Sequence, residues 1–240
     1  MHTIKLIAFD ADDTLWYTER LYVEAQGRLK SLLAHYLVDD QLDERLYQTE
    51  TRNLEHFGFG IKAFALSMIE TAIELTEGHI SARDIQDIIA SAREMLASDV
   101  ELLDHVSEAL AELAATHTLM LITKGDLRDQ ETKIARSGIA EHFRHIEIVS
   151  DKNAQIYETI LAKYAIRPQD FLMVGNSLRS DILPVLELGG NAAYVPQELT
   201  WVHETAELPR ATQPGFCQLK HLGQLPALIH RLEHQPREGS

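Results

Sequence analysis

The chain has 240 residues, of which 45% are apolar and 25% are charged. These proportions are typical of a globular protein and exclude a collagen-like fibre or a largely disordered chain. Lysine and arginine number 22 and aspartate and glutamate 37, so the formal net charge is −15 at pH 7. A surface this acidic repels phosphate backbones and anionic lipids, so we expect neither nucleic acid nor a membrane surface as a partner.

The single cysteine, Cys217, cannot form a disulfide within the chain. Met1–Asp10 shows no signal-peptide pattern, and we therefore predict a cytoplasmic protein. No apolar run approaches the ~20 residues that a membrane-spanning helix needs. The sequence favours no particular oligomeric state.

The first predicted element is a buried strand at Ile4–Phe9, which is apolar except for Lys5. The pattern then becomes helical and contains no convincing strand from Trp16 to Ser98. A Gly58–Phe59–Gly60 turn interrupts this stretch, and Ser81 with Asp84 resembles a capping box at the start of one helix.

Beyond residue 100 the pattern alternates between strands and helices, which predicts a parallel sheet with right-handed crossovers. The predicted strands are Thr118–Thr123, Ile146–Val149, Phe171–Val174 and Ala192–Val195. The predicted helices are Val100–Ala114, Leu127–Ser137, Ala154–Tyr164, Leu178–Leu188 and Leu222–Leu232, the last weakened by Pro226; Ala206–Pro214 is expected to be a loop and Pro236–Ser240 a frayed tail.

These elements predict an α/β fold with two domains. Residues 1–15 and 100–240 form a Rossmann-like, doubly wound parallel sheet core, and residues 16–99 form an all-helical domain inserted after the first strand.

Polar side chains follow four of the predicted strands at the point where each strand ends. Ligands of an open parallel sheet bind outside the carboxyl ends of its strands, so we expect these side chains to converge on one cleft. They are Asp10 and Asp12 after the first strand, Thr123 and Lys124, Lys152, and finally Asn176 and Asp181.

The residue types in this cluster indicate phosphoryl transfer. Asp10 and Asp12 are two apart, which places them on the same side of an extended strand end, and two adjacent carboxylates need a cation or a shared proton. A hard divalent ion with oxygen ligands fits, and Mg²⁺ fits best where a phosphate completes its coordination. Lys152 would add positive charge and Thr123 a hydrogen bond to a phosphate oxygen.

With these residues the chain resembles the haloacid dehalogenase superfamily, on its phosphatase side. The segment from Asp10 to Thr14 matches the family's Asp-x-Asp-x-Thr motif, Thr123 and Lys152 match the second and third motifs, and Gly175–Asp181 resembles the acidic fourth motif. The resemblance extends from Ile4 to about Val195, and the helical insertion is similar to the family's cap domain.

The resemblance implies a role for each motif residue. Asp10 would be the nucleophile that forms an aspartyl-phosphate, and Asp12 would protonate the leaving group, then activate water. Thr123 and Lys152 would bind the phosphoryl group of a small phosphorylated substrate; Lys124, from its position after the same strand, is a further candidate substrate contact. Mg²⁺ would be held by Asp10, Asp12, Asn176 and Asp181.

The fourth motif departs from the family pattern at one position. Many members carry an acid where this chain has Asn176. The amide oxygen can ligate a metal but is neutral, so we expect weaker Mg²⁺ binding, with Asp181 as a direct ligand or acting through water.

Asp12 favours a phosphatase over a haloacid dehalogenase, because displacing halide from carbon needs no proton donor, whereas an alkoxide leaving phosphorus does. A haloacid dehalogenase or a phosphonate hydrolase on the same scaffold, a receiver-type signalling module and a weakly active or non-catalytic phosphometabolite-binding member remain as alternatives.

The helical domain is expected to close over the site and select the substrate. Arg52 and Lys62 are its candidate contacts to an anionic part of the substrate.

Overall fold

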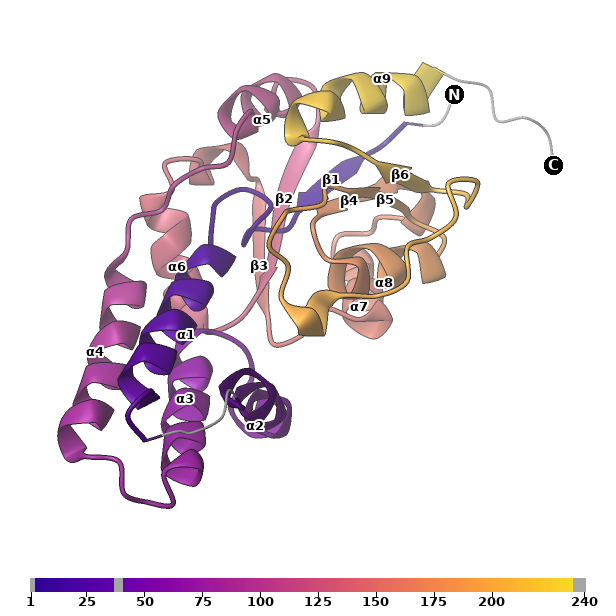
Figure 1. The fold of residues 1–240 in the computed structure, drawn as a ribbon. Coiled ribbons are helices and arrows are strands. Elements are labelled where there is room, and N and C mark those ends of the chain that lie inside the picture. The colour runs from indigo at the N-terminus through magenta and orange to yellow at the C-terminus, as the bar shows by residue number, and fades with distance from the viewer. Residues whose placement is uncertain (1–2, 37–40, 235–240) are drawn as a thin grey trace. The chain divides into compact units, whose positions relative to one another are not determined.

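The computed structural model describes residues 3–36 and 41–234. The chain divides into two compact units (Figure 1). One comprises the chain up to Glu19, Val100–Lys124 and the chain from Lys133 onward, and the other comprises Arg20–Asp99 with Gly125–Thr132. We call the first the core unit and the second the helical unit. The prediction of a frayed tail at Pro236–Ser240 lies outside the described residues.

The core unit is built on a six-stranded sheet in which all strands run parallel, as predicted. In space the order is β3-β2-β1-β4-β5-β6. The chain thus builds outward from β1 in one direction and then, from β4, in the other, so the order reverses between these two strands. The strands are β1 (Leu6–Phe9), β2 (Thr118–Lys124), β3 (His145–Val149), β4 (Phe171–Gly175), β5 (Asn191–Tyr194) and β6 (Phe216–Gln218).

Successive residues of the central strands enter opposite cores, because side chains alternate across a strand. Ile7 and Phe9 of β1 lie in one cluster with α5 (Val106–Ala114) and α9 (Leu225–His234). Leu6 and Ala8 lie in the other, with α7 (Ala154–Lys163) and α8 (Leu183–Glu187). Helices therefore cover both faces of the sheet (Figure 1), which explains why its strands read as continuous apolar runs.

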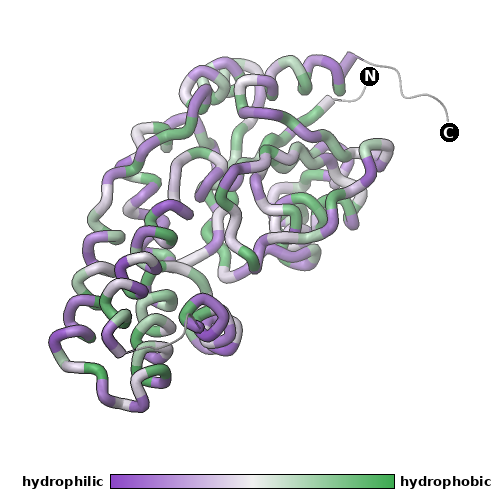
Figure 2. Tube along the Cα trace, viewed as in Figure 1, coloured by the Kyte–Doolittle hydropathy of each residue, from purple (hydrophilic) through white to green (hydrophobic). Residues whose placement is uncertain are grey.

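The helical unit holds its own apolar core. It contains α1 (Glu19–Leu33) from Arg20 on, α2 (Leu42–Phe57), α3 (Ile61–Leu75) and α4 (Ala82–Ala97). Helix α3 packs against both α2 and α4, and apolar and polar residues alternate along these helices in Figure 2. One half of the predicted capping box is present: Ser81 Oγ accepts a hydrogen bond from the backbone N–H of Asp84, whereas the N–H of Ser81 donates to the hydroxyl of Tyr36.

The observed elements differ from the predicted ones in three main places. The helix predicted at Val100–Ala114 begins only at Val106, because Leu102 instead forms a bridge with Trp16 and Leu103 donates to the carbonyl of Leu15. The helix predicted at Leu178–Leu188 is a π-helical turn, Leu178–Ile182, followed by α8. Strand β6 was not predicted.

Two other features of the fold concern Pro226 and helix α6. Pro226 lies in the first turn of α9, where its missing N–H costs no helical hydrogen bond. Helix α6 (Leu127–Arg136) contributes residues to both units.

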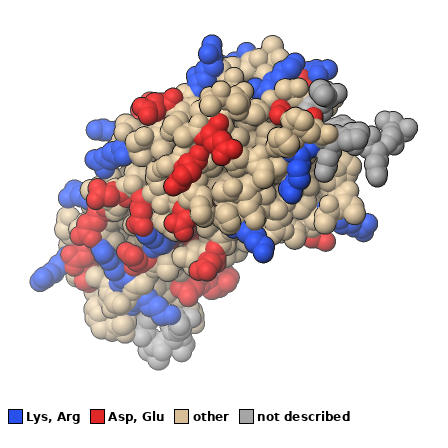
Figure 3. Space-filling model, turned by 90° about the horizontal axis from the view of Figure 1, so that it is seen from above, with Lys and Arg blue, Asp and Glu red and all other residues tan. Residues whose placement is uncertain are grey.

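Charge is mixed over the surface that Figure 3 displays. Among the described residues drawn there, acidic and basic side chains are interspersed and form no continuous basic band. None of the described helices combines the length and apolar content that crossing a membrane requires.

Candidate active site

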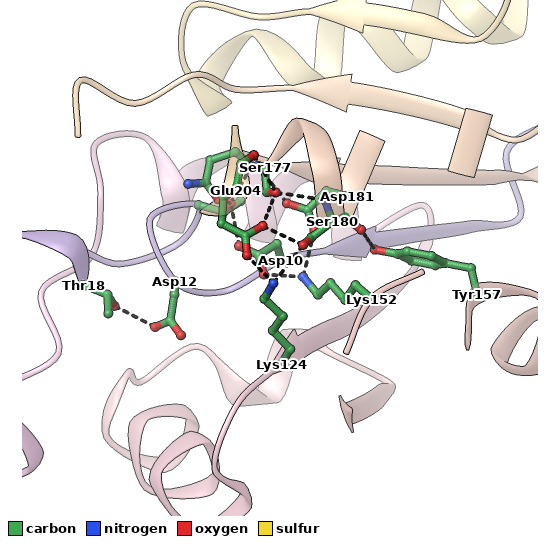
Figure 4. Close-up of polar contacts among 12 residues, drawn as sticks. Asp10, Asp12, Thr18, Lys124, Lys152, Tyr157, Ser177, Ser180, Asp181 and Glu204 are labelled. Carbon is green, nitrogen blue, oxygen red and sulfur yellow. Dashed lines mark hydrogen bonds and ion pairs between the residues drawn. The ribbon is translucent and has the colours of Figure 1, made fainter. Parts of the chain in front are cut away.

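Asp10, Lys152 and Asp181 of the predicted motifs meet at the carboxyl ends of the strands of the core unit (Figure 4). Phe9, the last residue of β1, pairs in register with Leu121 of β2 and Val174 of β4; β4 ends one residue farther along and β2 three residues farther. Asp10 follows β1, the strand beside which the sheet order reverses. This is where doubly wound sheets bind their ligands.

Asp10 and Asp181 share one buried ammonium group. Lys152 Nζ donates to Oδ1 of Asp10 and, over 2.8 Å, to Oδ1 of Asp181, and its side chain is only 1% exposed. Burial acts to lower the pKa of Lys152, but the two carboxylates outweigh it and raise that pKa well above its usual value. Lys152 is therefore a fixed positive charge beside Asp10.

Asp181 is completely buried against the turn that follows β4. Its Oδ2 accepts the backbone N–H of Ser177 at 3.0 Å. Burial raises the pKa of Asp181, while Lys152 acts to lower it. A Cβ atom on Gly175 would lie 2.2 Å from Oδ2 of Asp181, so this approach of carboxylate to backbone requires glycine.

The other oxygen of Asp10 faces a group of oxygens. Thr14 Oγ1 donates to Oδ2 of Asp10 at 3.0 Å. One terminus of the Asn176 amide lies 3.2 Å from the carbonyl oxygen of Asp12 and 3.3 Å from Oδ2 of Asp10. If that terminus is nitrogen, it donates to both oxygens; if it is oxygen, three oxygens converge with no proton between them.

The oxygen arrangement suits a magnesium ion. Octahedral Mg²⁺ binds oxygens at ~2.0–2.1 Å, which places neighbouring ligands about 3 Å apart. The spacings of 3.2 and 3.3 Å around the Asn176 amide are close to this value. The set consists of one carboxylate, one main-chain carbonyl and one amide; among the described residues, no group of three or more His, Cys, Asp or Glu side chains could hold a metal.

Thr123 carries a buried hydroxyl group at the end of β2. The residue is 1% exposed, and Oγ1 has no hydrogen-bond partner within the described part of the chain. Leaving such a group unpaired in the interior costs about 1–3 kcal/mol, so a hydroxyl kept here suits a ligand oxygen.

The carboxylate of Asp12 lies apart from that of Asp10, contrary to the expectation from strand alternation. Its Oδ1 accepts hydrogen bonds from Thr18 Oγ1 at 2.6 Å, Lys133 Nζ at 2.7 Å and Trp16 Nε1 at 2.8 Å, and Figure 4 shows it directed toward Thr18.

The reason for the displacement of Asp12 is a tight turn. The carbonyl of Ala11 accepts the N–H groups of Thr14 and Leu15, and Asp13 adopts a left-handed φ of 57°. The chain is therefore no longer extended at Asp12, and the two-residue spacing does not place the carboxylates on one side.

Lys124 pairs with a residue that the sequence reasoning missed. Its ammonium group donates to Oε1 of Glu204 and, at 2.8 Å, to Oγ of Ser180. Glu204 lies in the long loop after β5, whose sequence carries no motif. Lys133, the partner of Asp12, was missed as well, because a lysine in the last turn of a helix resembles any solvated one.

The two predicted substrate contacts of the helical unit are held by acidic neighbours. Arg52 Nη2 lies 2.9 Å from Oε1 of Glu74 and 3.3 Å from Oε1 of Glu70. Lys62 Nζ lies 2.7 Å from Oδ1 of Asp126. A role for either residue in binding substrate stays a prediction.

Comparison with known proteins agrees with the motifs. The family model of haloacid dehalogenase-like hydrolases matches residues 4–189, whereas no curated protein matches. A haloacid dehalogenase-like family hydrolase from Xanthomonas campestris is similar at 42% identity, with 96% of this chain and 92% of that chain covered and a TM-score of 0.86.

Two more distant structures share the fold. A 2-haloacid dehalogenase from Pseudomonas syringae is 24% identical, with 96% of this chain and 100% of that chain covered and a TM-score of 0.63. A magnesium-bound HAD-hydrolase from Bacillus subtilis is 14% identical, with coverages of 95% and 99% and a TM-score of 0.68. The family match over most of the chain, together with the 42% identical relative, shows that this protein belongs to the haloacid dehalogenase-like hydrolases.

Proposed function

We propose that this hydrolase is a Mg²⁺-dependent phosphatase that cleaves small phosphomonoesters through an aspartyl-phosphate on Asp10. The observation that carries the proposal is the surroundings of the Asp10 carboxylate: Lys152 bonds one oxygen, and the Asn176 amide and the Asp12 carbonyl lie beside the other. The unpartnered hydroxyl of Thr123 supports it.

In the first step, a carboxylate oxygen of Asp10 attacks phosphorus and the ester P–O bond breaks. The leaving alkoxide takes a proton from Asp12. In the second step, Asp12 accepts a proton from water, the hydroxide oxygen bonds to phosphorus, and the bond to Asp10 breaks to release phosphate. Asp12 has to rotate away from Thr18 and Lys133 to reach the leaving oxygen.

Lys152 and Thr123 are assigned to the transferring phosphoryl group. The ammonium of Lys152 bonds the Asp10 carboxylate and would offset charge that develops on the phosphoryl oxygens. Thr123 donates one hydrogen bond to those oxygens.

The candidate metal ligands are Oδ2 of Asp10, the carbonyl oxygen of Asp12 and Oδ1 of Asn176. When bound, Mg²⁺ would neutralise the substrate phosphate and orient it for in-line attack. Both oxygens of Asp181 already accept hydrogen bonds, from Lys152 and Ser177, so we place Asp181 in the outer shell, where such partners orient the direct ligands.

The helical unit is proposed to act as the cap that selects the substrate, with Arg52 and Lys62 as anion contacts. Unchanged KM values for both Arg52→Ala and Lys62→Ala across a panel of phosphate esters would remove these two residues from the proposal. The prediction of a cytoplasmic enzyme rests on the single Cys217 and is kept.

Phosphate release from para-nitrophenyl phosphate and a metabolite panel tests the reaction. We expect turnover with MgCl₂, none with EDTA, and a loss of roughly 10⁴-fold or more in Asp10→Asn. The exposed Asp104→Asn variant serves as the matched control and keeps full activity. Chloride release from 2-chloropropionate without phosphatase activity would instead identify a dehalogenase, and turnover of neither substrate would favour a binding protein.

A further inference from the structure

A buried carboxylate from outside the four motifs enters the site from the loop between β5 and β6. Oε2 of Glu204 accepts hydrogen bonds from Ser177 Oγ and, at 2.6 Å, from Ser180 Oγ, while Oε1 accepts from Lys124. The side chain of Glu204 is only 12% exposed. Three donors from two separate strand ends thus converge on one carboxylate (Figure 4).

The strand order shows what this contact spans. Lys124 ends β2, and Ser177 and Ser180 follow β4; these two strands flank β1. The bonds of Glu204 therefore connect the two strand ends on either side of Asp10. A second contact also joins this loop to the turn after β4: Arg179 donates a hydrogen bond to the main-chain carbonyl of His203 at 3.0 Å.

The positions that Glu204 holds adjoin the candidate catalytic groups. Ser177 follows Asn176 in sequence and Ser180 precedes Asp181. The hydroxyl of Ser177 also accepts the N–H of Ser180 at 2.9 Å, which caps the start of the π-helical turn. A shift of Ser177 or Ser180 would therefore move the amide and the carboxylate of the fourth motif.

The opposite charges of Lys124 and Glu204 further stabilise the contact between them. The side chains of Lys124 and Glu204 are 15% and 12% exposed, so each ion depends on the other for compensation. Burial acts to raise the pKa of Glu204, but Lys124 and the serine hydroxyls outweigh it and lower that pKa. Removing either charge leaves the other poorly paired.

We propose that Glu204 is a positioning residue for the hydrolytic reaction: it holds Lys124 and the fourth-motif turn in place on both sides of Asp10. The inference rests on the proposed phosphatase function. It also gives Lys124 a defined role, because the carboxylate of Glu204 fixes the position of its ammonium group, which is not a mobile surface cation. Misplacing groups around a reacting centre by about 1 Å can cost ~10²-fold in rate.

The test compares Glu204→Gln with Glu207→Gln, an exposed glutamate of the same loop. We expect Glu204→Gln to lower kcat for para-nitrophenyl phosphate by about 10- to 100-fold, the range typical of outer-shell partners, with KM changed less than about threefold. Glu207→Gln should stay at the wild-type values.

The double variant Lys124→Met/Glu204→Gln removes both charges, so neither ion is left without its partner. It therefore keeps the proposal testable if the single variant misfolds. Because Glu204 holds the fourth-motif turn as well as Lys124, the double variant should be slower than Lys124→Met but faster than the product of the two single losses predicts. Full multiplication of the two single losses, or an unchanged kcat in Glu204→Gln, would overturn the proposal.

A readout without turnover separates this inference from the proposed function. Lysine acetylation followed by mass spectrometry should modify Lys124 several-fold faster in Glu204→Gln than in the wild type. Lys133, equally shielded at 16% exposure, is the internal reference. If the wild type has no phosphatase activity but Glu204→Gln shows this change in labelling, the proposed phosphatase function is refuted and the positioning role of Glu204 is retained. If the labelling of Lys124 is unchanged in Glu204→Gln, the positioning role itself is refuted.

Discussion

Two buried threonines illustrate how an unpaired hydroxyl can be assigned to function. Thr123 of β2 and Thr71 of α3 each bury an Oγ1 atom that has no hydrogen-bond partner among the described residues. Thr123 lies at the carboxyl edge of the sheet, next to Lys124, whereas Thr71 lies within a helix of the helical unit. Only the first has a position that suits a substrate oxygen.

Replacing each threonine by the similarly shaped valine should separate the two cases. Both variants remove a hydroxyl whose burial costs free energy, so the free energy of unfolding should stay unchanged or rise by about 1 kcal/mol. Activity should fall by about 10²-fold in Thr123→Val, the usual cost of losing one donor to the transition state, and remain intact in Thr71→Val.

Urea denaturation and phosphate release measure the two effects. Equal activity in both valine variants would show that the hydroxyl of Thr123 does not contact the substrate, and a marked loss of stability in Thr123→Val would show that it has an internal partner.

The sequence pointed to those residues of the candidate site that lie next to strand ends, and it missed those that reach the candidate site from elsewhere. Asp10, Thr123 and Lys152 each follow an apolar run, so their convergence follows from the parallel sheet alone. Glu204 sits in a loop and Lys133 on a helix, where no local pattern distinguishes a buried ion pair from a solvated charge. Such contacts depend on the tertiary fold.

At the scale of secondary-structure elements, the length of a strand determined whether it could be predicted from the sequence. The first five strands have four or more residues, most of them apolar, and were found, whereas β6 has only three, Phe216–Gln218, and follows a proline-containing loop. The segment 100–105 has helical composition, but its main chain bonds to the strand-like segment at residues 15–17, and this tertiary pairing overrides local propensity.

The amino ends of β1 and β4 are joined by a buried carboxylate far from the site. Asp170 accepts two hydrogen bonds of 2.9 Å from Arg167 and lies 3.1 Å from Lys5 Nζ, with its own side chain 2% exposed. The Arg167 guanidinium holds the pKa of Asp170 below its ordinary value. The charged carboxylate therefore stabilises this end of the sheet.

We expect Asp170→Asn to lower the free energy of unfolding at neutral pH by about 1–2 kcal/mol, since both partners are largely exposed. The folded state binds fewer protons at Asp170 than the unfolded chain does. The stabilisation is therefore complete above the unfolded pKa and is lost as pH falls through the lower, folded one.

Thermal unfolding of wild type and Asp170→Asn between roughly pH 7 and pH 3 measures this dependence. The two midpoints should approach each other only below about pH 4. The exposed Asp87→Asn variant is the control and should show no such convergence; a difference for Asp170→Asn that is independent of pH would contradict an ionic origin.

For the molecule as a whole, the excess of negative charge extends to the candidate site, where Lys124 and Lys152 face the three carboxylates of Asp10, Asp181 and Glu204. The net charge is −15, yet Lys124 and Lys152 place two ammonium groups among the carboxylates at the end of the sheet. Within this site an added anion is disfavoured unless a cation accompanies it, which is the setting in which a phosphate ester would bind together with Mg²⁺.

Asn176 allows this balance to be tested through global stability. A ligand that binds only the folded state stabilises it by RT ln(1 + [L]/Kd), about 2.7 kcal/mol at a hundredfold excess over Kd. Asn176→Asp adds a carboxylate beside Oδ2 of Asp10. We therefore expect a lower melting temperature than wild type in EDTA, and a larger increase on addition of MgCl₂, because a charged oxygen binds Mg²⁺ more tightly than a neutral one.

Differential scanning fluorimetry in EDTA and in excess MgCl₂, with NaCl at matched ionic strength as the control, measures both effects. The salt control matters because screening alone relieves repulsion between the two carboxylates. If Mg²⁺ shifts the melting temperature of Asn176→Asp no more than that of the wild type, the oxygens of Asp10, Asp12 and Asn176 do not form the metal site. A larger shift that is specific to Mg²⁺ would show that the neutral amide of Asn176 weakens Mg²⁺ binding relative to the acid found at this position in many members of the family.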